Sequence, residues 1–385
     1  MYLDSLIILG WVLLAGSSAG CAYLAYAGWV TRRFAARAQQ RPVRSPPVSV
    51  LKPLCGEDPE LYENLASLCR QDYPAWQIVF GVQDAADPAI AVVRRVMAEF
   101  PAAELKLVIE AGRRGGNLKV ANLQNMLPAA RHDVIVIADS DMRVSPDYLA
   151  TVTAPLLDPA IGLVTCLYRG VPTGGFWSRL AALHINHGFL PQAMVADSLG
   201  ASGGCFGATL ALRRDTLAAI GGLAAIADQL ADDHALGAAV RGLGRTVVLS
   251  PYLVDNVIAE PSLAALFRHE LRWARTIRLV APAGFLGSIV THPMALALGA
   301  LALGTQPIAA PVLLLAALSC RALMVRMVDR ALGLVPTPLW LMPGRDLLSF
   351  AVFAASFFAR KVAWRDRTFR VGRDGQLILD GDRPA

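Results

Sequence analysis

The segment Val134–Asp141 has the sequence VIVIADSD and establishes the fold class of this 385-residue chain. Its five leading apolar residues, four of them β-branched, predict a strand that is buried on both faces, as in a parallel sheet. Asp139 and Asp141 follow at once, and on an extended backbone both carboxylates project to the same side. Ligands of open α/β sheets bind beyond the carboxyl ends of the strands. The segment therefore predicts both a sheet and a ligand site at its edge.

Three apolar segments before this strand predict further strands, and helical stretches separate them. The strands are expected at Val48–Leu51, Gln77–Val82 and Lys106–Ile109, and the helices at Glu60–Arg70 and Pro88–Glu99. Strands that alternate with helices predict a Rossmann-like α/β domain with a mostly parallel sheet. We expect this domain to span residues 45–262.

Composition and charge indicate a membrane protein. Charged residues make up only 17% of the chain, against roughly 25% in ordinary soluble domains. Leu6–Val30 is apolar, free of charge and long enough to cross a bilayer as a helix. Arginines follow it, starting at Arg32 and Arg33, so residues 1–31 are predicted to be an anchor with a cytoplasmic domain after it. The net charge is +6, and the arginines cluster beside apolar runs, which favours a membrane over a nucleic acid. Because no nucleic-acid-binding motif is present either, we expect no nucleic-acid partner.

The C-terminal part is apolar again and predicts several transmembrane or interfacial helices within residues 282–360. Membrane helices are expected at about 283–304, interrupted at His292-Pro293, and at about 307–323. The region 333–359 is broken by Pro343–Asp346, which predicts a re-entrant or interfacial hairpin. An amphipathic segment, 263–281, precedes this region, and a basic tail, 361–385, follows it and is expected to be cytoplasmic.

Acidic residues mark three candidate positions in the α/β domain. Asp84, at a strand end, suits a uracil N–H or a ribose hydroxyl, whereas Asp87 before Pro88 suits a helix N-cap. Asp139 and Asp141 offer hard oxygen ligands for Mg²⁺ or Mn²⁺, with an ordinary turn as the alternative.

The third acidic position is the pair Asp232-Asp233, which precedes the helical stretch Ala235–Arg241. We assign Asp232 to the helix cap. Asp233 is then a candidate general base, because a sugar-accepting hydroxyl must lose its proton as the new bond forms.

Cationic, aromatic and glycine residues form further candidate site motifs that are less specific. Arg272 suits a leaving diphosphate and Trp273 a sugar face or an apolar acceptor, although the segment also suits an amphipathic helix on a membrane surface. Asn117 and Lys119 suit a nucleotide or phosphate, and the turn with Gly203 and Gly204 allows close backbone approach to a ligand. Each of these two stretches is also typical of an ordinary loop.

The order of these motifs resembles the family-two type of inverting glycosyltransferase, with its GT-A fold, and more closely the ceramide glucosyltransferase family. The stretches that carry the resemblance are Val50–Leu54, Val82–Asp84, Asp87–Ile90, Asn117–Leu123, Asp139-Ser140, Arg143-Val144, Gly221–Leu223 and Arg272-Trp273. The segment His269–Arg278 looks most like a bacterial branch associated with hopanoid biosynthesis. That branch is thought to attach N-acetylglucosamine to bacteriohopanetetrol.

The resemblance implies a UDP-sugar donor, a membrane lipid acceptor and a divalent cation, with the enzyme in a bacterial inner membrane. It puts Lys52 and Lys119 near the nucleotide, and His187 either on the acceptor side or in a structural role. The family usually has Gln or Arg at the position of His269, so the resemblance supports a catalytic-site role less strongly for His269 than for Arg272. Asp141 completes a metal motif whose second acid ceramide-type members can lack.

Three alternatives remain at this point. One is a ceramide glucosyltransferase that makes glucosylceramide from UDP-glucose. The second is a processive polysaccharide synthase, which usually has several more membrane helices. The third is a non-catalytic nucleotide-binding membrane protein, against which the complete set of acidic and Arg-Trp positions argues.

Overall fold

The computed structural model describes residues 2–37, 45–200, 204–358, 361–364, 367–371 and 377–379. The chain divides into two units. The helical unit contains Met1–Arg37, Arg179–Gly200 and Glu260–Val362, and the α/β unit contains the remainder. A contiguous domain over 45–262 is expected from the sequence. The structure differs at Arg179–Gly200, which groups with the apolar helices.

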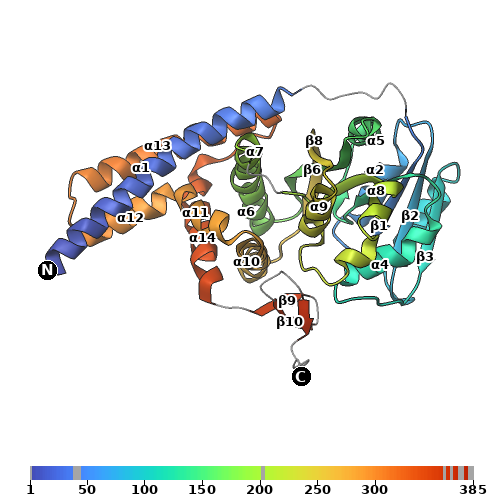
Figure 1. Ribbon diagram of the computed structural model, residues 1–385. Helices are drawn as coiled ribbons and strands as arrows, with labels where there is room; N and C mark the ends of the chain where they lie inside the picture. The colour runs from blue at the N-terminus through green and yellow to red at the C-terminus, as the bar shows by residue number, and fades with distance from the viewer. Residues whose placement is uncertain are drawn as a thin grey trace. The chain divides into compact units, whose positions relative to one another are not determined.

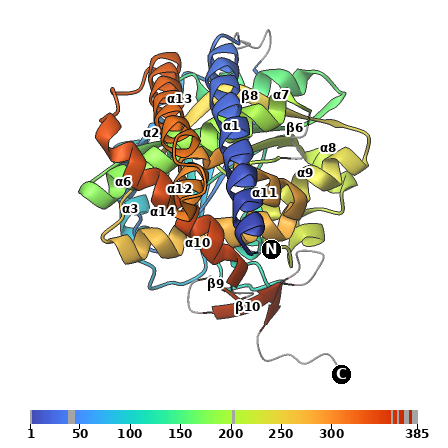
Figure 2. The ribbon, with the colours of Figure 1, turned by 90° about the vertical axis from the view of Figure 1, so that its left-hand side faces the viewer.

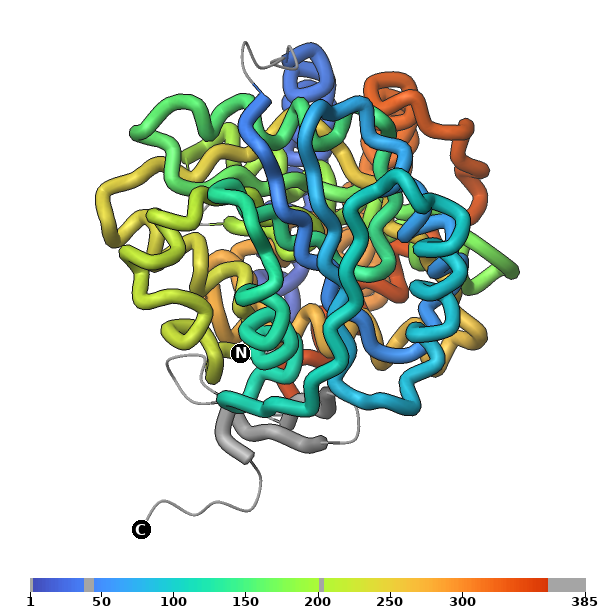
Figure 3. The backbone as a smooth tube through the Cα atoms, turned by 90° about the vertical axis from the view of Figure 1, so that its right-hand side faces the viewer, coloured from blue at the N-terminus to red at the C-terminus, as the bar shows by residue number. Residues whose placement is uncertain are grey.

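The α/β unit is built on a sheet of eight strands in the order β3-β2-β1-β4-β7-β6-β8-β5 (Figures 1 and 3). The strands are β1 Val48–Pro53, β2 Trp76–Val82, β3 Glu104–Ile109, β4 Val134–Ala138, β5 Met142–Arg143, β6 Ile161–Pro172, β7 Thr209–Arg213 and β8 Thr246–Ile258. Strands β1 to β4 pair in parallel, as do β6 and β8, whereas β7 and β5 pair antiparallel to their neighbours. The predicted mostly parallel sheet is confirmed.

Both faces of the sheet are buried, as the apolar character of β4 predicts. Val134 and Val136 pack into one core with helices α2 and α3, while Ile135 and Ile137 pack into the other with α4. The helices of this unit are α2 Leu61–Cys69, α3 Ala89–Glu99, α4 Leu118–Met126, α5 Tyr148–Thr153, α8 Arg214–Ala219 and α9 Asp232–Gly242. Because β1 pairs in parallel with both β2 and β4, the carboxyl ends of these three strands meet at one sheet edge.

The helical unit gathers segments from three parts of the chain. Its helices are α1 Tyr2–Ala35, α7 Leu190–Ser198, α10 Leu263–Val280, α11 Pro282–Gly287, α12 Pro293–Leu303, α13 Ala309–Leu332 and α14 Met342–Ala355, with α6 Phe176–His184 leading into it. Among the described residues, Leu3–Ala35, Ala309–Leu332 and Leu339–Phe358 are long and apolar enough to cross a membrane. The expected interruption at His292-Pro293 is a 68° bend before α12.

The predicted break at Pro343–Asp346 is wrong. These residues form the first turn of α14, which continues to Ala355. Proline is tolerated there because the first turn of a helix lacks an internal acceptor for its N–H groups. The segment Leu339–Phe358 therefore passes as one apolar helix of 20 residues rather than two short halves. A separate small sheet contains β9 Lys361–Trp364, β10 Arg367–Val371 and β11 Leu377–Leu379.

Helix α1 packs closely on α12 and α13 (Figures 1 and 2). A hydroxyl on α1, that of Ser17, donates a 2.9 Å hydrogen bond to the Pro293 carbonyl. One turn along, a Cβ added at Gly20 would lie 2.5 Å from the Val290 carbonyl oxygen and 2.8 Å from Cβ of Pro293. Small residues permit this backbone approach, as in other helix pairs that lack a hydrophobic driving force for association.

We expect Gly20→Ala to destabilise the protein by about 1–3 kcal/mol, because the added methyl group forces backbone apart in a packed interface. Gly344→Ala is the matched control, since Gly344 is also helical and nothing lies within 4 Å of its missing Cβ. Thermal unfolding in detergent micelles measures both. Equal midpoints for the two variants would contradict the packing described for α1.

Candidate active site

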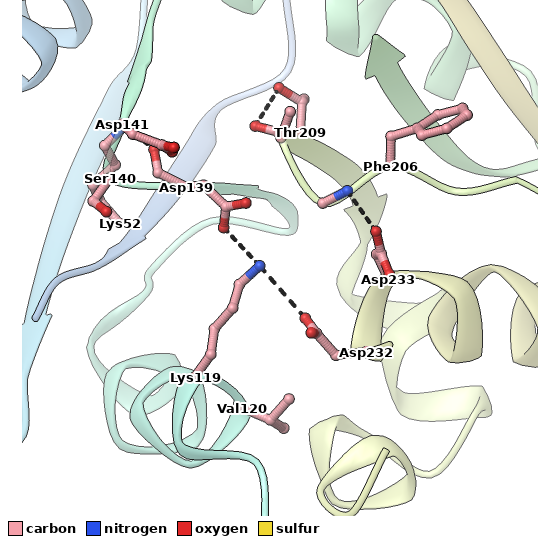
Figure 4. A network of polar contacts seen from close by, with 12 residues as sticks. Lys52, Lys119, Val120, Asp139, Ser140, Asp141, Phe206, Thr209, Asp232 and Asp233 are labelled. Carbon is pink, nitrogen blue, oxygen red and sulfur yellow. Dashed lines mark hydrogen bonds and ion pairs between the residues drawn. The ribbon is translucent and has the colours of Figure 1, made fainter. Parts of the chain in front are cut away.

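Three carboxylates surround the ammonium group of Lys119 at the carboxyl edge of the sheet (Figure 4). Lys119 Nζ lies 2.6 Å from Asp139 Oδ1, just after β4, and 3.5 Å from Asp232 Oδ2, in the first turn of α9. Asp233, the next residue of α9, also acts electrostatically on this group. Burial alone would lower the pKa of Lys119, but Asp139 and Asp232 outweigh it and raise this pKa above its usual range.

Asn117 aims Lys119 into this cluster. Its side-chain oxygen accepts hydrogen bonds from the backbone N–H groups of Lys119 at 3.0 Å and Val120 at 3.2 Å, so it caps α4. Its amide nitrogen donates to the Gln229 carbonyl at 2.9 Å and to Asp232 Oδ1 at 3.4 Å. One buried side chain thus ties the start of α4 to the start of α9. A contact of Asn117 with substrate stays a prediction.

The predicted capping role of Asp232 is wrong. Helix α9 begins at Asp232 itself, and the residue before it makes no side-chain capping bond. The Asp232 carboxylate is buried against Lys119 and Asn117 instead. An ion pair with a buried ammonium stabilises a carboxylate more than exposed N–H groups at a helix end do.

Asp233 is held by two backbone donors. The N–H of Gly207 donates to Oδ2 at 2.8 Å and the N–H of His234 to Oδ1 at 2.7 Å. Burial, followed by the negative charge of Asp232, raises the pKa of Asp233 to about 6. Its orientation is fixed, and its pKa lies near the range in which a carboxylate acts as a general base.

Gly207 is a site residue that sequence reasoning misses. A Cβ at this position would lie 3.4 Å from Asp139 Oδ2, Asp233 Oδ2 and Lys119 Nζ alike. A glycine at this position lets the backbone approach all three groups closely. The available signal is the third glycine of the segment Gly203–Gly207, of which the sequence analysis uses only the first two.

The pair Asp139 and Asp141 does not continue the strand. Strand β4 ends at Ala138, and a turn closes with the N–H of Met142 donating to the Asp139 carbonyl at 3.3 Å. The turn alternative is correct for the backbone. Asp141 accepts a 2.7 Å hydrogen bond from Asn256 on β8, and burial raises its pKa to about 6.

Lys52 lies at the end of β1, fully buried against this turn. Its ammonium group donates to the main-chain carbonyls of Asp139 and, at 3.2 Å, of Met142. Burial lowers the pKa of Lys52 to about 8. The structure thus gives Lys52 a supporting position behind the acidic turn, and its contact with a nucleotide stays a prediction.

The donor set fits a divalent cation bound together with a substrate. Among the residues that the structure describes, no three His, Cys, Asp or Glu side chains form a self-sufficient metal site. Mg²⁺ is commonly bound by one or two carboxylates together with substrate phosphates. Asp139 and Asp141 would supply the carboxylates. The ammonium on Asp139 shows that this position already stabilises positive charge.

The remaining predicted residues of the α/β unit lie at its loops. Asp84 is exposed at the end of β2, where its carboxylate accepts a 2.9 Å bond from the Ala86 N–H. Asp87 caps α3 through the N–H of Ala89 at 2.9 Å, as predicted. Gly203 lies outside the described residues, whereas Gly204 is the first described residue after that gap. The uridine contact assigned to Asp84 stays a prediction.

In the helical unit, α10 carries the predicted Arg272 and Trp273. The helix is capped by Ser262, whose hydroxyl accepts from the Ala265 N–H at 3.2 Å. His269 bonds Glu260 at 2.7 Å through Nδ1, and its ring lies 4.3 Å from the Trp273 ring. His269 therefore contacts Trp273, which supports an orienting role for this residue.

His187 is buried in the helical unit, in the π-helical segment Ile185–Phe189. Its Nε2 lies 2.8 Å from Asp329 Oδ1, and Asp329 also accepts from the Thr337 hydroxyl at 3.0 Å. With 1% of its side chain exposed, His187 fits the structural alternative rather than direct contact with an acceptor.

Known proteins are similar to this chain in sequence. The chain is 25% identical to ceramide glucosyltransferase 1 of Caenorhabditis elegans over 86% of its own length and 73% of that protein's. It is 24% identical to an N-acetylglucosaminyltransferase of Rhizobium leguminosarum bv. viciae over 60% of its length and 55% of that protein's.

A solved structure agrees with the fold. The mannosyltransferase PcManGT of Pyrobaculum calidifontis, in complex with GDP-Man and Mn²⁺, superposes with a TM-score of 0.54 and 21% identity, covering 91% of this chain and 99% of that one. The predicted GT-A fold is confirmed. The sequence profile described as "Glycosyl transferase family 21" matches residues 12–377. The chain belongs to this glycosyltransferase family.

Proposed function

We propose that the protein transfers a sugar from a UDP-sugar to a hydroxyl of a membrane lipid, with inversion at the anomeric carbon. The observation that carries this is the convergence of Asp139, Asp233 and Lys119 on Gly207, where an added Cβ would lie 3.4 Å from each of them. This convergence places a carboxylate that is a candidate base beside groups suited to a diphosphate.

Asp233 acts as the general base in this proposal. The lipid hydroxyl attacks the anomeric carbon from the side opposite UDP and gives its proton to the Asp233 carboxylate. The N–H groups of Gly207 and His234 hold the two carboxylate oxygens in place, so little reorganisation is needed as the bond forms. One displacement with one base accounts for inversion.

Cationic groups oppose the negative charge that develops on the leaving UDP. Lys119 supplies one positive charge at Asp139, and a divalent cation held by Asp139 and Asp141 would supply Lewis-acid stabilisation of the diphosphate. The complex of PcManGT with GDP-Man and Mn²⁺ supports this use of a cation. Arg272 is proposed to add a further positive charge, and Trp273 to line the acceptor site.

Two pairs of sugar donor and lipid acceptor are candidates for the reaction. The resemblance of the segment His269–Arg278 favours N-acetylglucosamine transfer to bacteriohopanetetrol, which we propose as the reaction, with the α/β unit on the cytoplasmic side of a bacterial inner membrane. The ceramide glucosyltransferase of C. elegans, similar over 86% of the chain, favours glucose transfer to ceramide as the second candidate.

Purified protein in lipid vesicles tests the function. Vesicles contain bacteriohopanetetrol, ceramide or neither, and each receives UDP-N-acetylglucosamine or UDP-glucose after EDTA treatment and addition of Mg²⁺ or Mn²⁺. We expect cation-dependent UDP release and a glycosylated bacteriohopanetetrol by mass spectrometry. Glucosylceramide as the preferred product would select the second candidate, and no glycolipid from any pair would reject the proposed function.

Asp233→Asn should lower turnover by about 10²–10⁴-fold, because the amide cannot accept the proton of the hydroxyl. Binding of the UDP-sugar, measured by calorimetry, should change little. Asp215→Asn is the control, since Asp215 lies on the exposed surface of α8. Near-normal turnover of the Asp233 variant would remove this residue from the role of base.

The pH dependence of turnover should have an acid limb near pH 6, because a pKa of about 6 leaves Asp233 protonated and inactive below this pH. Asp232→Asn should move the limb to lower pH, since it removes a negative charge that raises the pKa of Asp233. A series of kcat values across pH measures both. An unmoved limb in the Asp232 variant would contradict the assignment of the limb to Asp233.

A further inference from the structure

A buried ion pair joins α10, the helix of Arg272 and Trp273, to α14. Nη1 and Nη2 of Arg345 lie 2.8 and 2.7 Å from the two carboxylate oxygens of Glu270. Only 1% and 2% of the two side chains are exposed. The pair was not singled out from the sequence, because Arg345 falls in the segment interpreted there as a helix break.

The guanidinium group of Arg345 is saturated with acceptors. Besides Glu270, it donates to the Ser349 hydroxyl at 3.1 and 3.3 Å and approaches the Leu180 carbonyl at 3.4 Å. A bidentate arginine–carboxylate pair constrains both distance and orientation of its partners. A buried pair of this kind is weak evidence for stability, since apolar side chains of similar volume stabilise a protein as well. Geometry is therefore the property that this pair provides.

The position of Glu270 on α10 converts that geometry into an orientation for Arg272. Successive residues of an α-helix are rotated by about 100°, so Arg272 projects from nearly the opposite side of the helix to Glu270. Trp273 and His269 project from one flank, where their rings contact each other. Anchoring Glu270 on Arg345 thus fixes the rotation of α10 about its own axis and, with it, the direction of Arg272.

The neighbouring residue of α14 makes a second, independent ion pair. Asp346 Oδ1 lies 2.6 Å from Nη2 of Arg321 on α13, and Arg321 also donates to the His187 carbonyl at 2.9 Å. This pair is partly buried, with 12% and 15% of the side chains exposed. It joins α14 to α13 and does not include α10. Adjacent residues therefore hold two different helices.

We propose that Arg345 is a positioning residue for the transfer reaction, acting through Glu270 to hold Arg272 in its working orientation. The inference rests on the proposed function, in which Arg272 opposes charge on the leaving diphosphate. It predicts that kcat falls even in protein that remains folded, because a displacement of about 1 Å at a catalytic group costs up to roughly 10²-fold in rate.

The test uses the full-length protein in lipid vesicles. Arg345→Lys keeps the charge but loses the bidentate geometry, and Arg345→Met loses both. Each should lower kcat by about 10-fold or more while the UDP-sugar dissociation constant stays within about twofold. The reversed pair Glu270→Arg with Arg345→Glu should recover part of kcat. Asp346→Asn, the matched control on the same helix, should lower the thermal midpoint without this loss of kcat.

A double-mutant cycle with Arg272→Ala identifies the route of the effect. If Arg345 acts through Arg272, then Arg345→Met should reduce the residual kcat of Arg272→Ala by less than about twofold. Full multiplication of the two effects, or equal kcat losses in the Arg345 and Asp346 variants, would overturn the proposal. Normal turnover of Arg272→Ala would overturn it as well, whereas failure of the proposed function would appear separately, as normal turnover of Asp233→Asn.

Discussion

The candidate active site of the α/β unit depends on the contact of Lys119 with Asp139 and Asp232. Three carboxylates in one partly buried place repel each other, and without a cation this loop arrangement would be costly. The ammonium of α4 neutralises part of that charge and connects the ends of β4 and α9. Asn117, which caps α4, fixes the ammonium in this place. The acidic cluster is thus preorganised by the protein's own cation.

The helical unit uses charge in a different way. Two of its ion pairs lie among apolar helices and each joins one arginine to one carboxylate: Arg345 to Glu270 and Arg321 to Asp346. Apolar helices in a membrane associate through side-chain packing, without a hydrophobic driving force. A buried ion pair adds a constraint on rotation, because turning a helix would leave a buried charge unmatched, which is unfavourable. Close contacts such as that at Gly20 set the spacing of helices, while ion pairs set their rotation.

Local patterns predicted what local physics determines. The strands β1 to β4 and helix α3 follow from runs of apolar residues and from Asp87 and Pro88, whose effects act within a few residues. The sequence predicts the wrong role for Asp232 because its partner, Lys119, lies 113 positions earlier in the chain. No residue near Asp232 indicates this contact. Pro343 suits both a break and a helix start, and only the packing of α14 distinguishes them. Gly207 and Asn256 became visible as site residues only once distant segments met. Sequence alone thus identifies acids that the fold brings close together better than it predicts what each of them contacts.

The donor that holds Asp233 Oδ2 is the main-chain N–H of Gly207 and not a side chain. A main-chain donor does not titrate, and replacing the side chains around it leaves it present. The residues that contact an acceptor can therefore vary without releasing the carboxylate from its position. In the proposed function, the acceptor can therefore change while the backbone alone keeps the proposed base aligned.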